Sequence, residues 1–335
     1  MIFPILAVCH LIHLSKSHIL TVTNYNVSWK TFKETHNKIY ETAKEEQLRK
    51  SVFLYNKEKI NQHNLEYEIG LHTYTMGVNQ FTDLTEEEFF DFYTMKASQD
   101  QHYTFTQESD LFSSIYKYIN ISQLPKDVDW RKYNVVSRVK NQGHCGACWA
   151  FATTGALEAQ WARRTKKLVS LSEQNLVDCS WFYGNHGCSG GWMENAIDYI
   201  INNHGIDTEQ SYPYLARNFF CHYNPRAKGA TASQVVLTKN ELELQAAVAT
   251  VGPVAVAIEV SSNFYKYSRG VYDDDACGQN ANHALLVVGY GVEEGKPYWL
   301  VKNSWGPSWG EEGYIKMVRN RNLCGIADHG TYPVV

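Results

Sequence analysis

Apolar and polar positions divide the chain into three stretches with different patterns. Residues 2–14 are apolar apart from two histidines, whereas residues 18–123 carry many charges, no cysteine and an apolar spacing typical of helices. After residue 123, helical patterns come first and short apolar runs typical of strands come later. Helices followed by strands predict an α+β fold for this last stretch.

The last stretch is predicted to contain three main helices and four main strands. The helices are expected to start near residue 148 and to cover 170–177 and 193–202. The strands are expected at 254–258, 284–288, 298–301 and 313–319. The histidines are scattered, and no spacing typical of a metal site is present, so we expect neither a metal nor another cofactor.

The clearest helical pattern spans residues 45–64. At about 100° per residue, six of its positions fall on one face of a single helix. These positions are Glu45, Arg49, Phe53, Asn56, Ile60 and Asn64. Periodicity alone would also fit an ordinary amphipathic helix. Further along, Thr85 with Glu88 three residues later predicts the capped start of another helix.

The first residues have the features of a secretory signal. Their apolar run is too short to span a bilayer, and residues 15–17 offer small side chains for cleavage. We therefore predict a signal peptide over 1–17, no stable membrane insertion, and a protein of the secretory pathway that is lysosomal or secreted. Asn26 and Asn120 stand in glycosylation sequons, which predict a glycoprotein.

Charge and cysteine count narrow the function further. A net charge of -4 gives no reason to expect binding to nucleic acid. One of the eight cysteines lies in the predicted signal peptide, so seven remain. Six of them can pair in an oxidising compartment, and one is left as a free thiol.

Cys148 is the candidate nucleophile. Gly143 and Gly146 predict a tight turn just before it, and an alanine-rich helical run follows it. Unpaired N–H groups at the start of a helix stabilise an anion, so the pKa of the Cys148 thiol should be lowered. Cys145 and Cys148 also have C-x-x-C spacing, which is typical of a thiol–disulfide oxidoreductase as well.

The segment Cys145-Gly146-Ala147-Cys148-Trp149 resembles the active-site segment of papain-like cysteine peptidases, the cathepsin L type in particular. Two further patterns are similar to the propeptide motifs of those enzymes. One is the six-position helical face in 45–64, and the other is Gly77-x-Asn79-x-Phe81-x-Asp83.

The resemblance implies a preproenzyme with three segments. They are a signal peptide over 1–17, a helical inhibitory propeptide over 18–123 and a peptidase domain over 124–335. The peptidase domain should have a helical subdomain and a β-barrel subdomain that meet at a cleft. The propeptide should lie in that cleft in reverse orientation, so that it blocks the enzyme without being cut.

Three further residues complete the implied active site. His283 and Asn303 follow Cys148 by 135 and 155 residues, in the chain order expected of the family. Cys148 and His283 should form a thiolate–imidazolium pair, and the Asn303 side chain should orient the imidazole. Gln142 and the backbone N–H of Cys148 should form the oxyanion hole. Trp305 should shield the bond between His283 and Asn303 from water.

The resemblance also implies disulfides and substrate contacts. The disulfides are Cys145–Cys188, Cys179–Cys221 and Cys277–Cys324, which leave Cys148 free and disfavour the oxidoreductase. Gly146, Gly190 and Gly191 should contact the substrate, the last two as an extended strand edge. The S2 pocket should be lined by Trp192, Met193, Ala257, Ala284 and His329. Such a pocket favours a bulky apolar P2 residue, although Trp192 and His329 depart from the usual family residues.

The sequence therefore predicts a cysteine endopeptidase that is made as an inactive zymogen and activated by acid. Its partners should be peptide and protein substrates, its own propeptide and cystatin-type inhibitors. Ion pairs of Asp83 and Glu45 in the propeptide are the hypothetical acid trigger. An inactive homologue that acts as a binding protein is the other alternative, and it would require the loss of Cys148, His283 or Gln142.

Overall fold

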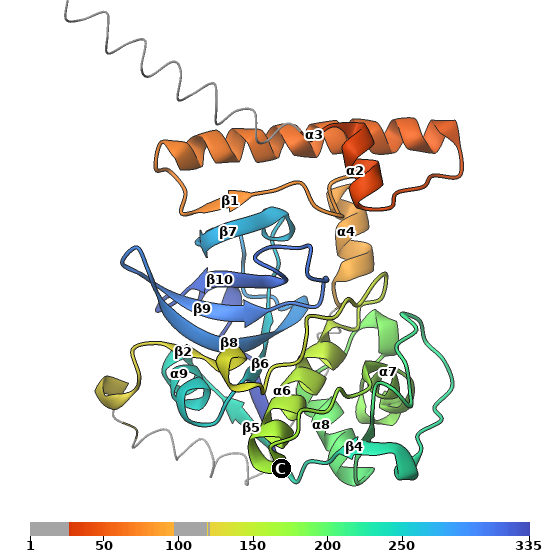
Figure 1. Cartoon of the computed structure of the whole chain (residues 1–335), viewed down its shortest axis with the longest axis vertical. Helices are drawn as coiled ribbons and strands as arrows, with labels where there is room; N and C mark the ends of the chain where they lie inside the picture. Colours follow the sequence, from red (N-terminus) through yellow and green to blue (C-terminus); the bar gives the residue numbers. More distant parts are fainter. Residues whose placement is uncertain (1–26, 97–118, 120) are drawn as a thin grey trace, which may run out of the picture.

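The computed structural model describes residues 27–96, 119 and 121–335 (Figure 1). The predicted signal peptide and both glycosylation sequons lie wholly or partly outside these residues. None of the helices in the described ranges has the length and apolar content needed to cross a bilayer. No group of three or more His, Cys, Asp or Glu side chains in the same ranges could hold a metal ion.

The N-terminal segment consists of helices, a short strand and a loop. Its helices are α2 (Trp29–Thr35), α3 (Ala43–Glu68) and α4 (Glu86–Tyr93), and its strand is β1 (Tyr74–Met76). The predicted helical face in 45–64 is confirmed, because Phe53, Asn56, Ile60 and Asn64 are the buried residues of α3 together with His63. The predicted capping box is also present, with reciprocal bonds between Thr85 and Glu88 at the start of α4.

Residues 121–335 begin with helices and continue with strands, as predicted. The helices are α6 (Cys148–Thr165), α7 (Glu173–Cys179), α8 (Met193–Asn202) and α9 (Glu241–Thr250). The main strands are β5 (Gln234–Thr238), β6 (Val254–Ile258), β7 (Tyr267–Tyr272), β8 (His283–Glu293), β9 (Lys296–Lys302), β10 (Tyr314–Val318) and β11 (Gly330–Val334). Short pairs are β2 (Val128–Asp129) on β8 and β3 (Ile206–Asp207) on β4 (Lys228–Ala230).

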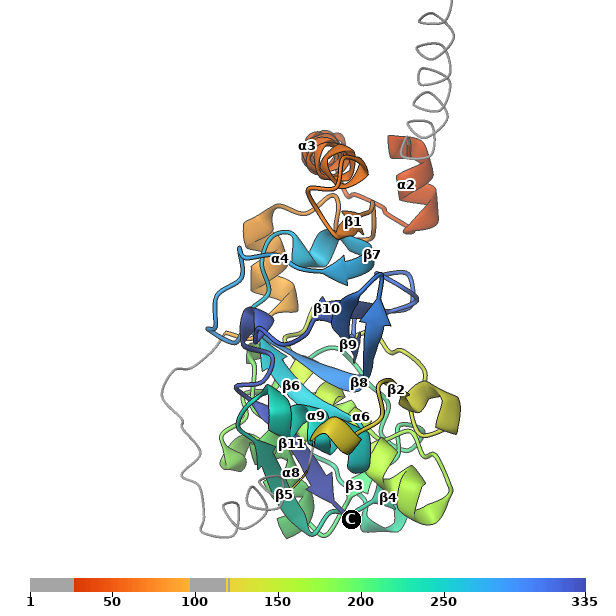
Figure 2. The same ribbon diagram turned by 90° about the vertical axis from the view of Figure 1, so that its left-hand side faces the viewer.

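The main sheet is open, so the predicted β-barrel is wrong in this respect. Its order is β1-β7-β10-β9-β8-β6-β11-β5, and no pairing in the described ranges joins the two end strands. Strand β1 of the N-terminal segment forms one edge, where it pairs antiparallel with β7. Figures 1 and 2 both show α3 and β1 stacked over β7 at one end of the molecule.

Strand β8 separates two hydrophobic cores. Successive side chains of a strand point to opposite faces. Leu285 and Val287 accordingly belong to the core of the sheet and of α3 and α4. Leu286 and Val288 belong to the core that α6, α7 and α8 cover. His283 begins β8, so the sheet places this residue at the boundary between the two halves.

Three disulfides support the helical half and the end of the chain. They are Cys145–Cys188, Cys179–Cys221 and Cys277–Cys324, the three pairs predicted. Cys148 is free and fully buried. Because Cys145 is already paired with Cys188, the C-x-x-C spacing does not form a redox pair in this structure.

Candidate active site

Cys148 is the first residue of α6, and the turn before it has little room for side chains. Gly143 has a φ of +58°, in the left-handed region that favours glycine. A Cβ on Gly146 would lie only 2.6 Å from the Cys188 carbonyl oxygen and 2.8 Å from that of Thr94. The predicted tight turn is therefore present, and it brings the thiol to the start of the helix without a side-chain cap.

His283 and Asn303 come together across two neighbouring strands. The Nε2 atom of His283 lies 2.9 Å from Oδ1 of Asn303, as predicted. Because an amide oxygen can only accept a hydrogen bond, Nε2 carries the proton of the imidazole, and Nδ1 is the unprotonated nitrogen. Nδ1 is buried and has no hydrogen-bond partner among the described residues. Trp305 stacks on the His283 ring at 4.6 Å, which fits its predicted shielding role.

Burial disfavours the charged forms of both the Cys148 thiol and the His283 imidazole in this structure. Burial raises the pKa of the Cys148 thiol to about 12, and hydrogen bonds with the backbone only partly offset it. Burial also lowers the pKa of His283 to about 4, although the hydrogen bond with Asn303 acts in the opposite direction and raises it. The predicted lowering of the Cys148 pKa is therefore wrong for this covered state, because excluding water disfavours both charged forms.

Gln142 is fixed by hydrogen-bond partners that no sequence motif indicates. Ser304 donates its hydroxyl to Oε1 of the Gln142 side chain at 2.6 Å, and the Tyr214 hydroxyl donates to the backbone carbonyl of Gln142 at 2.8 Å. The amide nitrogen is thereby left to donate to the carbonyl oxygens of Cys145 at 2.8 Å and Tyr93 at 3.3 Å. A carbonyl of the N-terminal segment thus stands at the predicted oxyanion hole.

Comparison with known proteins decides the family. Residues 124–334 match the model described as papain family cysteine protease, and residues 29–89 match the cathepsin propeptide inhibitor domain. The chain belongs to the papain family of cysteine proteases. It is made as a proform in which its own inhibitor domain precedes the protease.

Named relatives support this assignment. A cathepsin L-like peptidase of Aedes aegypti is 47% identical over 324 residues, and the match covers 92% of each chain. Cathepsin S of Mus musculus is 48% identical and covers 92% of this chain and 90% of its own. A digestive procathepsin L2 proteinase from the larval midgut of Tenebrio molitor has a TM-score of 0.83 at 44% identity, with 92% of this chain and 98% of that chain covered.

The propeptide runs through the cleft of this protease beside the free thiol. The N–H of Met95 donates to the Asn282 carbonyl at 2.7 Å, and the N–H of Lys96 donates to the Ser189 carbonyl at 3.2 Å. We call Tyr93–Lys96 the cleft segment. Its Tyr93 carbonyl accepts from the Gln142 side chain, and its Met95 side chain lies in the same apolar cluster as the fully buried Cys148. The cleft segment therefore helps to cover the thiol.

The predicted glycine edge differs in detail from this cleft. Residues 187–189 form a 3-10 turn, and the glycines after it are not in a strand. The Ser189 carbonyl accepts the backbone bond from the cleft segment. Gly190 allows the cleft segment to approach closely, since a Cβ added there would lie 3.2 Å from that of Met95. A Cβ on Gly191 would instead lie 2.5 Å from Oδ1 of Asn185, inside the protease.

The predicted S2 residues lie in one region. Met193, Ala257 and Ala284 are buried in the same apolar cluster, which also contains Met95 of the cleft segment. Ala257 and Ala284 are directly paired across β6 and β8. Trp192 packs against this cluster, and its ring lies 5.1 Å from that of His329.

A buried ionic cluster, which was not predicted from the sequence, lies next to Asn303 and Ser304 of the active site. Lys140 bonds to the carboxylates of Glu158 and Glu173 at 3.1 and 2.6 Å. Next to Asn303, Lys302 donates to the Ser137 hydroxyl at 3.0 Å. Burial lowers the pKa of Lys302 to about 8 and raises that of Glu173 to about 7. These residues come from four distant segments, so no local motif signals the cluster.

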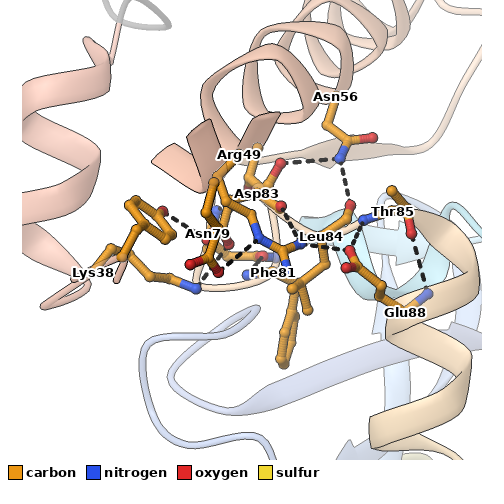
Figure 3. A network of polar contacts seen from close by, with 12 residues as sticks. Lys38, Arg49, Asn56, Asn79, Phe81, Asp83, Leu84, Thr85 and Glu88 are labelled. Carbon is orange, nitrogen blue, oxygen red and sulfur yellow. Dashed lines mark hydrogen bonds and ion pairs between the residues drawn. The ribbon is translucent and has the colours of Figure 1, made fainter. Parts of the chain in front are cut away.

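The inhibitor domain is held together by a second polar network (Figure 3). Asp83 is buried and accepts from Lys38 at 2.7 Å and from Tyr40 at 2.9 Å. Arg49 pairs with Glu88 at 2.6 Å, and Glu45 lies 3.9 Å from Arg49 at the exposed edge. Asp83 and Glu45 are therefore both ion-paired, as hypothesised, but the pair of Glu45 is long and exposed, and Glu88 makes the shorter pair with Arg49.

Proposed function

We propose that the chain is a cysteine endopeptidase whose zymogen is opened by acid. The observation that carries this proposal is the Tyr93 carbonyl, which accepts from Nε2 of Gln142, the residue six positions before the free Cys148. A substrate carbonyl in the same place would lie next to both the nucleophile and the oxyanion donors. Cys148, His283, Asn303 and Gln142 are all present, which disfavours an inactive homologue.

The mechanism follows from uncovering the cleft. Removal of the cleft segment readmits water, which reduces the penalty that burial imposes on the charged thiol and imidazole. Proton transfer from Cys148 to His283 then gives the thiolate–imidazolium pair. The thiolate attacks the substrate carbonyl, and His283 returns the proton to the leaving amine as the C–N bond breaks. His283 next takes a proton from water, which hydrolyses the thioester and frees the thiol.

Asn303 and Gln142 support this reaction without taking part in bond exchange. Asn303 holds the imidazole through Nε2, so Nδ1 is directed to the thiol side. Ser304 and Tyr214 hold Gln142 so that its amide N–H can stabilise the oxyanion. A donor fixed before the reaction needs no reorganisation in the transition state.

The S2 residues support a preference for bulky apolar P2 side chains. Met95 of the propeptide occupies the cluster that contains Met193, Ala257 and Ala284. His329 adds an imidazole to this region, and histidine is the side-chain type whose charge changes between pH 5 and 8. The His329 ring lies beside Trp192. Protonation of His329 should therefore raise kcat/KM for substrates with Glu at P2 and lower it for substrates with Arg at P2. The measurement is the ratio of kcat/KM for substrates with Leu, Glu and Arg at P2, at pH 5 and at pH 7. These ratios should differ between wild type and His329→Ala. Equal ratios in the two enzymes would show that His329 has no role in specificity.

Acid activation is supported by the carboxylates of the inhibitor domain. Partial burial raises the pKa of Glu88, but bonds from Arg49 and Thr85 outweigh it, so the pKa is lowered. Stability from this group is present above its unfolded pKa and is lost as pH falls through the folded pKa. Asp83→Asn should also weaken docking at neutral pH, because Lys38 and Tyr40 lose a buried carboxylate. An unchanged pH profile of processing would exclude Asp83 from the trigger.

Localisation and inhibitors belong to the same proposal. A signal peptide, lysosomal or secreted destination, glycosylation and recognition by cystatin-type inhibitors are proposed from the sequence motifs and the family. An exopeptidase is disfavoured because the sequence contains no inserted loop with paired histidines and its propeptide contains no cysteine for a tether.

The test is a pair of substitutions at Cys148. Cys148→Ala should abolish peptide hydrolysis and leave a folded proenzyme, because the change removes little volume. Cys148→Ser should be nearly inactive, since a hydroxyl is too weakly acidic to pair with an imidazolium. Turnover by purified Cys148→Ala within tenfold of wild type would overturn the proposal.

A further inference from the structure

Four exposed aromatic side chains gather on the protease domain. The solvent-exposed fractions are 102% for Phe182, 82% for Phe220, 50% for Phe219 and 43% for Trp181. We call these four residues the aromatic patch. Large apolar side chains are usually buried, and a contiguous exposed group of them typically marks an interaction site.

The patch comes from two segments that lie close together. The disulfide Cys179–Cys221 joins the segments, with Cα atoms 4.8 Å apart, two residues before Trp181 and one residue after Phe220. Both segments also meet at Gly187, where an added Cβ would lie 2.2 Å from Asn218 and 3.0 Å from Trp181.

The Trp181 ring and the backbone at Phe219 are held in place. Nε1 of Trp181 donates to the Val177 carbonyl at 2.9 Å, and the N–H of Phe219 donates to the buried Asp178 carboxylate at 2.8 Å. Fixed aromatic side chains lose little conformational entropy when they bind, so exposed rings of this kind are efficient contacts.

The patch adjoins the unprimed end of the substrate cleft. The ring of Trp181 lies 6.2 Å from that of His186. His186, together with Gly184 and Trp192, lines a hollow whose wall also includes Met95 and Lys96 of the cleft segment. The surface that receives the propeptide backbone therefore continues directly into the aromatic patch.

We propose that the aromatic patch binds apolar or aromatic side chains of the substrate about two to four residues upstream of P3. This proposal rests on the proposed function, which defines the unprimed side of the cleft. An extended chain rises about 3.3 Å per residue. Two residues beyond the hollow are thus enough to bring a substrate ring from His186 to Trp181, whose ring lies 6.2 Å away.

The test compares long and short peptides with the acid-activated enzyme. Two long peptides share the same sequence from P3 to P3′, with Leu at P2, and carry either two Phe or two Ser at P5 and P6. A short peptide ends at P3. Wild type should cleave the Phe peptide with about tenfold higher kcat/KM than the Ser peptide, mainly through KM.

The double variant Phe182→Ser/Phe220→Ser should bring that ratio to within twofold of one and should cleave the short peptide at the wild-type rate. Tyr133→Ser is the matched control, because Tyr133 is 66% exposed elsewhere on the domain, and it should keep the tenfold ratio.

Equal rates on both long peptides in wild type, or a tenfold ratio retained by the double variant, would overturn the proposal. Concentration-dependent dimerisation that the double substitution abolishes, with peptide ratios unchanged, would assign the patch to a second copy instead. Failure of wild type to cleave the short peptide would overturn the proposed function together with this inference.

Discussion

The propeptide contacts the protease in two different ways. The inhibitor domain docks through side chains and strand pairing: Asn79 donates to the Tyr265 carbonyl at 2.7 Å, Gln80 donates to the Trp305 carbonyl at 2.7 Å, and β1 extends the sheet at β7. The cleft segment instead bonds to the protease through its backbone, and the side chains of Tyr93, Thr94 and Met95 are buried against the protease.

This difference separates recognition from inhibition. Docking depends on particular side chains, whereas a cleft that hydrolyses many peptides must read the backbone and tolerate many side chains. The inhibitor domain therefore supplies the specificity, and the cleft segment blocks the thiol because docking places it there. The rate at which an epoxide labels Cys148 in the intact proenzyme measures how often the segment leaves the cleft.

The largest effect is expected from Asn64→Ala in α3. The Asn64 amide donates to the Met76 carbonyl and accepts from its N–H, both at 2.9 Å, and so fixes β1 on the helix. Leaving these buried groups unpaired costs about 3 kcal/mol, so labelling at pH 7 should accelerate on the order of 100-fold. Gln62→Ala on the exposed side of α3 is the control and should change labelling less than twofold; an equal rate in both variants would contradict the role of docking.

A smaller, pH-dependent effect is expected from Glu88→Gln. The variant loses the charge that Arg49 pairs with at 2.6 Å, so labelling at pH 7 should accelerate about fivefold to tenfold. The difference in labelling rate between variant and wild type should disappear as pH falls through the lowered pKa of Glu88. The wild-type carboxyl is then protonated and, like the Gln side chain, uncharged. Glu87→Gln, at an exposed neighbour, should follow wild type at every pH. A gap that stays constant down to pH 4 would exclude Glu88 as a sensor.

The smallest effect is expected from Lys96→Ala in the cleft segment. Its ion pair with Asp91 is 3.5 Å long and exposed, whereas its backbone N–H, which bonds to Ser189, is retained. Labelling at pH 7 should change less than twofold, since exposed ion pairs contribute little. An acceleration comparable with that of Asn64→Ala would show that the cleft segment is recognised through its side chains.

Much of this arrangement could be predicted from local patterns. The face of α3, the capping box at Thr85 and the helix at Cys148 follow from spacing within one segment. Contacts between distant segments could not be predicted in this way. The cluster around Lys140, the Ser304 bond to Gln142 and the open sheet edge depend on how segments pack.

The predicted thiolate was wrong for the covered proenzyme for a different reason. A helix start favours an anion when water reaches it, but in the proenzyme Cys148 is fully buried, and the loss of solvation outweighs the helix. The charge state of the site therefore depends on a cover that the active-site motif does not encode.

The most direct test of this account is the site and pH dependence of epoxide labelling in wild-type proenzyme. Mass spectrometry of the digested protein should find almost no adduct at pH 7 before activation. After acid treatment it should find one adduct per molecule, on Cys148, with Cys145 still in its disulfide with Cys188. Rapid labelling before acid treatment, or an adduct or reversible dithiol couple at Cys145, would contradict the account.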